Sequence, residues 1–227
     1  MRICVIVAVS VPDPIALYPL NSKYEAREIN NKQPEGTLGN VSLAAGPDGK
    51  PGGSFQFFGQ VNSYIDFPND GGLDVNHSIT MLCWVYPESS AISGPLFYYT
   101  DYNPSVVGGV QLWIDSGKLV ARFEESYQEP LTTTDPLALN NWHYVGSSYD
   151  GNTGMASLWL NGTSVVSQDI GYITLATGYN VAMGEIYDNR FFQGRITAMQ
   201  VYDVALTAVQ INAVKDAGRG DRGTTYS

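Results

Sequence analysis

The carboxylates of this chain are spaced in a way that does not suit acid–base catalysis. Hydrolysis of a glycosidic bond needs two carboxyl groups facing each other across the substrate, one as the acid and one as the nucleophile or base. Glu185 and Asp188 lie three residues apart, so on a strand they would point to opposite faces. The adjacent pair Glu124 and Glu125 has the same defect, and Asp66 stands alone. We therefore predict that the protein is not an enzyme.

The residue types that serve other catalytic and metal sites are few. The two histidines are His77 and His143, and we expect His143, which follows a tryptophan in an apolar segment, to be structural. Phosphate-binding loops, Gly-x-Ser-x-Gly and His-Glu-x-x-His are missing from the sequence. Two cysteines, Cys4 and Cys83, are too few for a zinc site, and they are either one long-range disulfide or two buried free thiols.

The charge of the chain restricts its partners. The formal net charge is −10, with only 12 lysines and arginines. An acidic protein repels phosphate backbones and anionic membrane surfaces, so we expect no nucleic-acid binding. Cations, neutral sugars and basic protein surfaces remain as partners, and calcium is open because it takes oxygen ligands.

The elements that must position any site are mostly strands. Glycine (24), proline (12) and tyrosine (15) are plentiful, and short apolar or alternating segments are separated by turn residues nearly throughout. Such a pattern is typical of a two-sheet sandwich or a barrel. We predict strands over residues 15–20, 54–58, 64–67, 79–86, 95–99, 109–114, 118–123, 142–149, 155–160, 163–167, 180–184 and 194–202.

Two local signals are more specific. Asn161-Gly162 is a favoured two-residue turn for a hairpin between its flanking strands. Only residues 206–214 have helical spacing, and Thr207 with Gln210 three residues later can form a capping box at the start of that helix. In the strand over residues 79–86 apolar side chains fall on both faces, as in a sheet that is covered on each side.

The ends of the chain are predicted separately from its body. Residues 1–13 are either an N-terminal strand or a short leader, residues 14–214 form one domain, and residues 215–227 form a flexible tail. No apolar run approaches the roughly 20 residues that span a bilayer. Three Asn-x-Ser/Thr sequons, a low lysine content and the leader-like start favour a secreted, extracellular protein. The sequon asparagines are Asn40, Asn76 and Asn161.

Several segments, in this order, resemble laminin-G-like and pentraxin-like domains of the concanavalin A-like lectin/glucanase superfamily. They are Ser54-Phe-Gln-Phe-Phe-Gly59 with Tyr64-Ile-Asp-Phe-Pro68, Ser78-Ile-Thr-Met-Leu-Cys-Trp84-Val-Tyr-Pro87, Asn141-Trp-His-Tyr-Val145, Leu158-Trp-Leu-Asn-Gly162 and the stretch from Gly184 to Ile211. The resemblance covers residues 14–214 and implies an all-β fold, a two-sheet antiparallel jelly-roll sandwich with one short C-terminal helix.

The resemblance places the tryptophans in that sandwich. Trp84, Trp142 and Trp159 lie among apolar residues, and we expect their rings to fill the space between the sheets. For Trp113 two readings stay open: core packing, or an exposed concave face on which a sugar ring could stack.

The resemblance also implies calcium positions. In pentraxin-like relatives an Asp/Asn pair and an acidic loop hold the ion, and the matching residues here are Asp101, Asn103 and Asp188. The sequence departs from the pattern at Ile186, where an oxygen donor would be expected. Those three side chains leave main-chain carbonyls and water to complete a shell of 6–8 oxygens, so plain loop polarity is the alternative.

Two other family features are also testable. Some jelly rolls hold calcium between the first and last strands, where Asn21 and Asp203 would be the candidates. The pentraxin disulfide does not carry over, because Cys83 matches one partner while the other falls near Val145.

The best-supported function is a non-catalytic extracellular module that recognises a glycan or a protein. The candidate loops are residues 100–108, 124–135 and 185–190, with Trp113, Asn189 and Arg190 as candidate ligand-binding residues. The alternative is a structural, adhesion or self-assembly module that acts through a sheet face, as an oligomer, or through the integrin-type tripeptide Arg219-Gly220-Asp221. A glycoside hydrolase of the same fold is the third reading.

Overall fold

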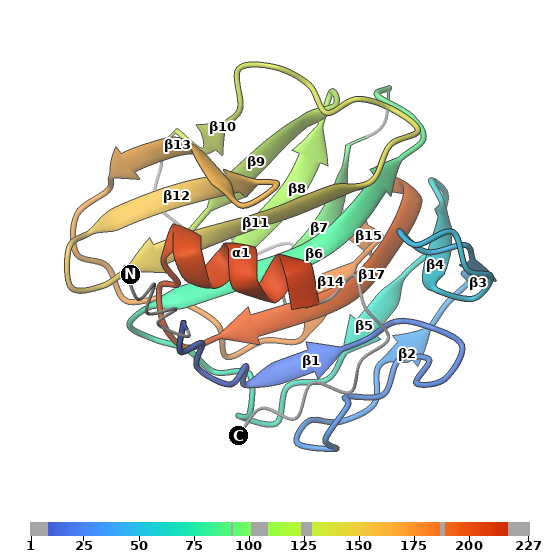
Figure 1. Cartoon of the computed structure of the whole chain (residues 1–227), viewed down its shortest axis with the longest axis horizontal. Coiled ribbons are helices and arrows are strands. Elements are labelled where there is room, and N and C mark those ends of the chain that lie inside the picture. The colour runs from blue at the N-terminus through green and yellow to red at the C-terminus, as the bar shows by residue number, and fades with distance from the viewer. Residues whose placement is uncertain (1–8, 92, 101–108, 124–128, 187–188, 218–227) are drawn as a thin grey trace, which may run out of the picture.

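The computed structural model describes residues 9–91, 93–100, 109–123, 129–186 and 189–217. They form two large antiparallel sheets packed face to face, with one helix on the outside (Figure 1). Sheet A has the order β13-β12-β11-β6-β17-β4-β3, with β1 also paired to β17, and sheet B has the order β10-β9-β8-β7-β14-β5-β2. A small hairpin, β15-β16, forms a separate two-stranded sheet. The predicted all-β jelly-roll sandwich is therefore confirmed.

The elements have the following bounds. In sheet A they are β1 (Ala16–Tyr18), β3 (Ser42–Ala44), β4 (Ser54–Phe58), β6 (Ile79–Pro87), β11 (His143–Asp150), β12 (Met155–Leu160), β13 (Thr163–Asp169) and β17 (Gln193–Tyr202). In sheet B they are β2 (Thr37–Leu38), β5 (Ile65–Phe67), β7 (Gly94–Tyr99), β8 (Gln111–Asp115), β9 (Lys118–Arg122), β10 (Leu131–Thr132) and β14 (Val181–Met183). The remaining elements are β15 (Glu185–Ile186), β16 (Arg190–Phe191) and α1 (Ala208–Ala217).

Each of the twelve strands expected from the sequence is present, with ends that agree within two residues. The strands that were not predicted are β2, β3, β10, β15 and β16, each only two or three residues long. A segment of that length is too short to show a period of two, so the sequence carries no signal for it.

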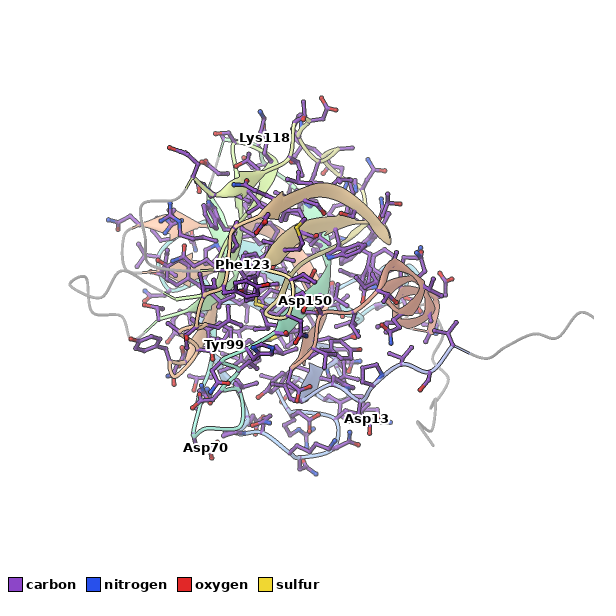
Figure 2. All side chains as sticks on the ribbon, turned by 90° about the vertical axis from the view of Figure 1, so that its left-hand side faces the viewer. Asp13, Asp70, Tyr99, Lys118, Phe123 and Asp150 are labelled. Atoms are coloured by element: carbon purple, nitrogen blue, oxygen red, sulfur yellow. The ribbon has the colours of Figure 1, made fainter. Side chains whose placement is uncertain are left out.

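The main core lies between the two sheets and is rich in aromatic rings. Tyr18 and Phe67 pack with ring centroids 4.5 Å apart, and Phe123 lies 5.9 Å from Tyr149. Figure 2 shows Tyr99 and Phe123 in the interior of the sandwich. Burial of such side chains contributes about 1.5–3 kcal/mol each and holds the sheets together.

A second apolar cluster lies outside sheet A and corrects one prediction. Trp84 and Trp159 do not fill the space between the sheets; they belong to a separate cluster on the outer face of sheet A, where Ile211 and Val214 of α1 cover them. Trp142 packs half-buried at its margin. The apolar residues on both faces of β6 correctly predicted that both faces are covered. Sheet B covers one face, and helix α1 covers the other.

Local signals for the helix and the hairpin are confirmed. The hydroxyl of Thr207 accepts a hydrogen bond from the main-chain N–H of Gln210 (3.4 Å), and the Gln210 side-chain oxygen accepts one from the N–H of Thr207 (2.9 Å). The helix runs to Ala217, three residues into the predicted tail. Between β12 and β13, Asn161 and Gly162 have φ of 53° and 86°, as a two-residue hairpin turn with both central residues left-handed requires.

The strand pairing also tests the predictions for Cys83 and for a calcium ion between Asn21 and Asp203. Cys83 is a buried free thiol, and it lies directly opposite Val145, where the resemblance placed the missing partner. Cys4 lies outside the described residues. The calcium pair was wrong: β1 and β17 are antiparallel, so Asn21 and Asp203, which follow the C-terminal ends of those two strands, lie at opposite ends of the ladder.

Candidate functional site

A row of five side chains, four of them polar, crosses the outer face of sheet B, and its central members Ala182, Tyr98 and Gln111 are buried. The strand register aligns Asp66, Ala182, Tyr98, Gln111 and Arg122 across β5, β14, β7, β8 and β9. Their neighbours along each strand, such as Leu112 and Ala121, belong to the core between the sheets. Because successive side chains of a strand alternate between faces, the row points away from that core.

Trp113 lies on the same face of β8, two residues after Gln111, and Arg190 covers its ring. The guanidinium carbon of Arg190 is 5.5 Å from the ring centroid of Trp113 and 5.4 Å from that of Tyr98. Only 7% of the surface of Trp113 is exposed. A cation over aromatic rings at this distance is attracted by the ring quadrupoles, with about 0.5–1 kcal/mol at exposed sites and more when desolvated.

The β15-β16 hairpin is what brings Arg190 to the two rings. Ile186 packs against Tyr98 and Ala182, which fixes the first strand of the hairpin on sheet B. Asn189 has φ of 65°, and its N–H donates to the carbonyl of Ile186 at 3.2 Å to close the turn. Asparagine tolerates this left-handed conformation, so the turn delivers the next residue, Arg190, over the sheet.

Two buried polar atoms near this face have no hydrogen-bond partner among the described residues. They are Nε of Arg122 and Oε2 of Glu185. A buried polar atom without a partner costs about 1–3 kcal/mol, so each is a place where a ligand group or a water would be stabilising. Planar charged and amide groups beside aromatic rings can bind the hydroxyls and the C–H face of a sugar.

Several residues predicted as site residues cannot be located. Asp101, Asn103 and Asp188, the candidate calcium ligands, lie outside the described residues, as does the Arg219-Gly220-Asp221 tripeptide. Within the ranges that the structure describes, no group of three or more His, Cys, Asp or Glu residues could hold a metal ion. Calcium therefore stays a prediction.

The other candidates have clear positions. The sequon residues Asn40, Asn76 and Asn161 are all exposed, and the side-chain oxygen of Asn161 accepts a hydrogen bond from the N–H of Tyr144 at 3.0 Å. Nε2 of His143 lies 2.9 Å from the carbonyl oxygen of Ala138, which fits its expected structural role.

The sequence singled out Trp113, Asn189 and Arg190, and the structure brings Trp113 and Arg190 together. The sequence analysis did not identify Tyr98, Gln111 or Arg122 as site residues. Once the strands are assigned, alternation does place Gln111 on the same face as Trp113. The bulge between Pro95 and Phe97 shifts the alternation in β7, so Tyr98 could not be assigned from its strand alone.

Comparison with known families agrees with the fold. The family model described as the concanavalin A-like lectin/glucanases superfamily matches residues 58–212, which is more than half of the chain. The chain belongs to this superfamily. No curated protein sequence matches this superfamily member.

Solved structures show the same fold at low sequence identity. Domain 4 of AbnA, an extracellular GH43 arabinanase from Geobacillus stearothermophilus in complex with arabinotriose, is 20% identical with a TM-score of 0.69, and the match covers 90% of this chain and 99% of that domain. The binding domain of Paraclostridial Mosquitocidal Protein 1 is 15% identical with a TM-score of 0.70, and the match covers 90% of this chain and 52% of that one. A heptameric SAP-like pentraxin from Limulus polyphemus is 18% identical with a TM-score of 0.55, and the match covers 70% of this chain and 79% of that one.

Among the described residues of this superfamily member, no helix has the length and apolarity to cross a membrane.

Proposed function

We propose that this superfamily member is a non-catalytic recognition module that binds a glycan on the outer face of sheet B and acts outside the cell. The observation that carries the proposal is the position of Arg190 over both Trp113 and Tyr98, beside the polar row that includes Gln111 and Arg122. Displacement of the guanidinium from Trp113 would free an aromatic face for a sugar ring, and the N–H groups of Arg190 and of the half-buried Arg122 would donate hydrogen bonds to its hydroxyls.

The structurally similar proteins favour recognition over catalysis, so glycan binding is tested first. One was solved in complex with arabinotriose, and another is the binding domain of a mosquitocidal protein. The charge of −10 supports a neutral glycan over an anionic one. Calcium assistance through Asp101, Asn103 and Asp188 is part of the proposal, because in the sequence the first two follow β7 of sheet B and the third lies between β15 and β16.

The test is a glycan array that includes arabinotriose, probed with and without a calcium chelator. We expect binding to neutral glycans, and Arg190→Met should weaken it by about tenfold or more, because the variant removes the charge-assisted hydrogen bonds from the guanidinium to the sugar, which contribute about 1.5–3 kcal/mol each. The matched control is Arg27→Met, because Arg27 is an exposed arginine elsewhere on the molecule. Equal binding by both variants would contradict this site, and binding that survives the chelator would contradict the calcium part.

The proposal of no catalysis has its own measurement. The protein is incubated with soluble β-glucans and arabinans, and new reducing ends are counted. We expect none above a buffer blank. Hydrolysis that disappears in Glu185→Gln would establish a glycosidase and overturn the assignment, because that variant removes the carboxylate with little change of shape.

A self-assembly module is the second candidate, and one observation favours it. Strand β13 ends sheet A with seven residues, has β12 as its one partner among the described strands, and lacks Lys, Arg and Pro. Val165 on this strand is 43% exposed. An unprotected edge strand is a template for pairing with another chain. Sedimentation at increasing concentration tests it: association that is abolished by Val165→Lys would favour this candidate, and a monomer throughout would exclude it.

A further inference from the structure

A second set of side chains with recognition chemistry lies on the opposite side of the molecule, on the outer face of sheet A. The register aligns Tyr86, Arg195, Gln56 and Ser42 across β6, β17, β4 and β3. Trp142, just before β11, packs its ring 5.4 Å from that of Tyr86. Helix α1 covers the neighbouring part of this sheet but leaves the start of β17 and the end of β6 uncovered (Figure 1).

Three contacts hold Arg195 in the middle of this row. Its guanidinium carbon is 4.7 Å from the centroid of the Tyr86 ring, and its Nε lies 3.2 Å from Oε1 of Gln56 and 3.3 Å from Oε1 of Glu88. Nε is the one nitrogen of the guanidinium that these contacts use, and no described residue accepts a hydrogen bond from its two Nη groups. The side chain is 28% exposed, so these donors are within reach of a ligand.

Glu88 supplies the complementary acceptor. Its Oε2 accepts a hydrogen bond from Nε2 of Gln56 at 2.7 Å, and its side chain is 21% exposed. A carboxylate oxygen can accept more than one bond, so both oxygens keep acceptor capacity. The Arg195–Glu88 pair carries no net charge. On a chain with net charge −10, a neutral pair favours a neutral ligand over an anion.

We propose that the row of Trp142, Tyr86, Arg195, Gln56 and Glu88 is a second binding site, for a neutral carbohydrate with adjacent hydroxyl groups. A hydroxyl accepts a hydrogen bond from Nη of Arg195, and its neighbour donates one to Glu88. The half-exposed rings of Tyr86 and Trp142 lie one and two strands away and contact the C–H face of the sugar or of the next residue in its chain. The exposed ring of Phe58, on the adjoining strand β4, extends the apolar margin.

The alternative is that these side chains only stabilise the sheet surface. An exposed ion pair contributes about 0–1 kcal/mol, and a partly exposed cation–ring contact a similar amount. A role in stability alone would not distinguish sugars from other solutes. The deciding experiment must therefore measure a ligand, with folding monitored separately.

The test uses the Arg190→Met protein, in which the site on sheet B is weakened, so the two sites are read independently. It is probed on an array of neutral and acidic oligosaccharides that includes arabinotriose. We expect retained binding to neutral glycans, reduced about tenfold or more by Arg195→Met and by Glu88→Gln but not by Arg27→Met. Methionine keeps the aliphatic contact with Tyr86, and glutamine keeps the shape of Glu88.

Two outcomes would overturn the proposal: no neutral glycan retained by the Arg190→Met protein, or retained binding that both variants leave within twofold of their parent. If either variant fails to fold, the wild-type protein decides the question by NMR. The indole N–H signal of Trp142 and the guanidinium signals of Arg195 should shift on addition of a bound glycan, and unshifted signals would exclude the site.

Discussion

Removal of one side chain from α1 tests the arrangement in which the helix, rather than the second sheet, covers Trp84 and Trp159. Ile211 is fully buried in that outer cluster, whereas Val209 on the same helix is 60% exposed. Ile211→Ala removes three carbons, which corresponds to about 2.4 kcal/mol of lost burial at about 0.8 kcal/mol per methylene. The cavity that remains adds a further cost, and the better helix propensity of alanine offsets a few tenths.

The expected loss for Ile211→Ala is therefore about 3 kcal/mol, within the usual range for such truncations in a core. Val209→Ala is the matched control and should change stability by less than about 0.5 kcal/mol, because the side chain is exposed. Urea unfolding followed by tryptophan fluorescence measures both, and the dependence of free energy on urea should stay unchanged. The emission of Trp84 and Trp159 reports directly on the helix contact.

The result that would refute this reasoning is a cost for Ile211→Ala no larger than that of Val209→Ala. In that case the helix would not be packed on sheet A, and the two tryptophans would have to be covered by something else. A total stability of about 5–15 kcal/mol is usual for a domain, so the variant should still fold and remain measurable.

Three further outcomes follow from the described contacts. Thr207→Ala removes the cap that accepts from Gln210 and should cost about 1 kcal/mol in urea unfolding, while a change below about 0.3 kcal/mol would contradict the capping box. Burial raises the pKa of the Cys83 thiol, so iodoacetamide should label it only as the chain unfolds, and rapid labelling in buffer would show that it is accessible. Burial, with a smaller effect of nearby carboxylates, also raises the pKa values of Tyr18 and Tyr99. Their neutral forms favour the folded state below the unfolded pKa of about 10, so stability should fall as pH rises above that value; a stability that is constant from pH 8 to 11 would be inconsistent with burial of both phenols.

The fold could be predicted because its signals are local and repeated. Alternation over five or more residues gave the long strands, and Asn161-Gly162 gave the β12-β13 hairpin with its left-handed φ values. The short strands β2 and β15 carry no such period. What α1 covers could not be read from periodicity either, since a double-sided apolar strand is compatible with a sheet or a helix on its second face.

The candidate site was predictable only in part. Trp113 and Arg190 were chosen from separate loops and strands, but their contact depends on the β15-β16 hairpin, in which Ile186 is fixed against Tyr98. That hairpin is set by long-range packing, which no window of sequence contains. The strand register is likewise absent from the sequence, so the polar row through Gln111 and Arg122 became visible only once the strands were paired.

The two outer faces favour recognition for the same physical reason. Each carries a guanidinium over an aromatic ring: Arg190 over Trp113 and Tyr98 on sheet B, and Arg195 over Tyr86 on sheet A. Among the described residues, Arg195 makes no hydrogen bond from its two Nη groups, and a planar guanidinium packed on a ring loses little entropy when a ligand binds. Two sheets separate the faces, and sheets pack about 10 Å apart, so ligands at the two sites would act independently. Such a module could hold two glycan chains at once, and the gain from joining them would come from effective concentration rather than from any contact between the sites.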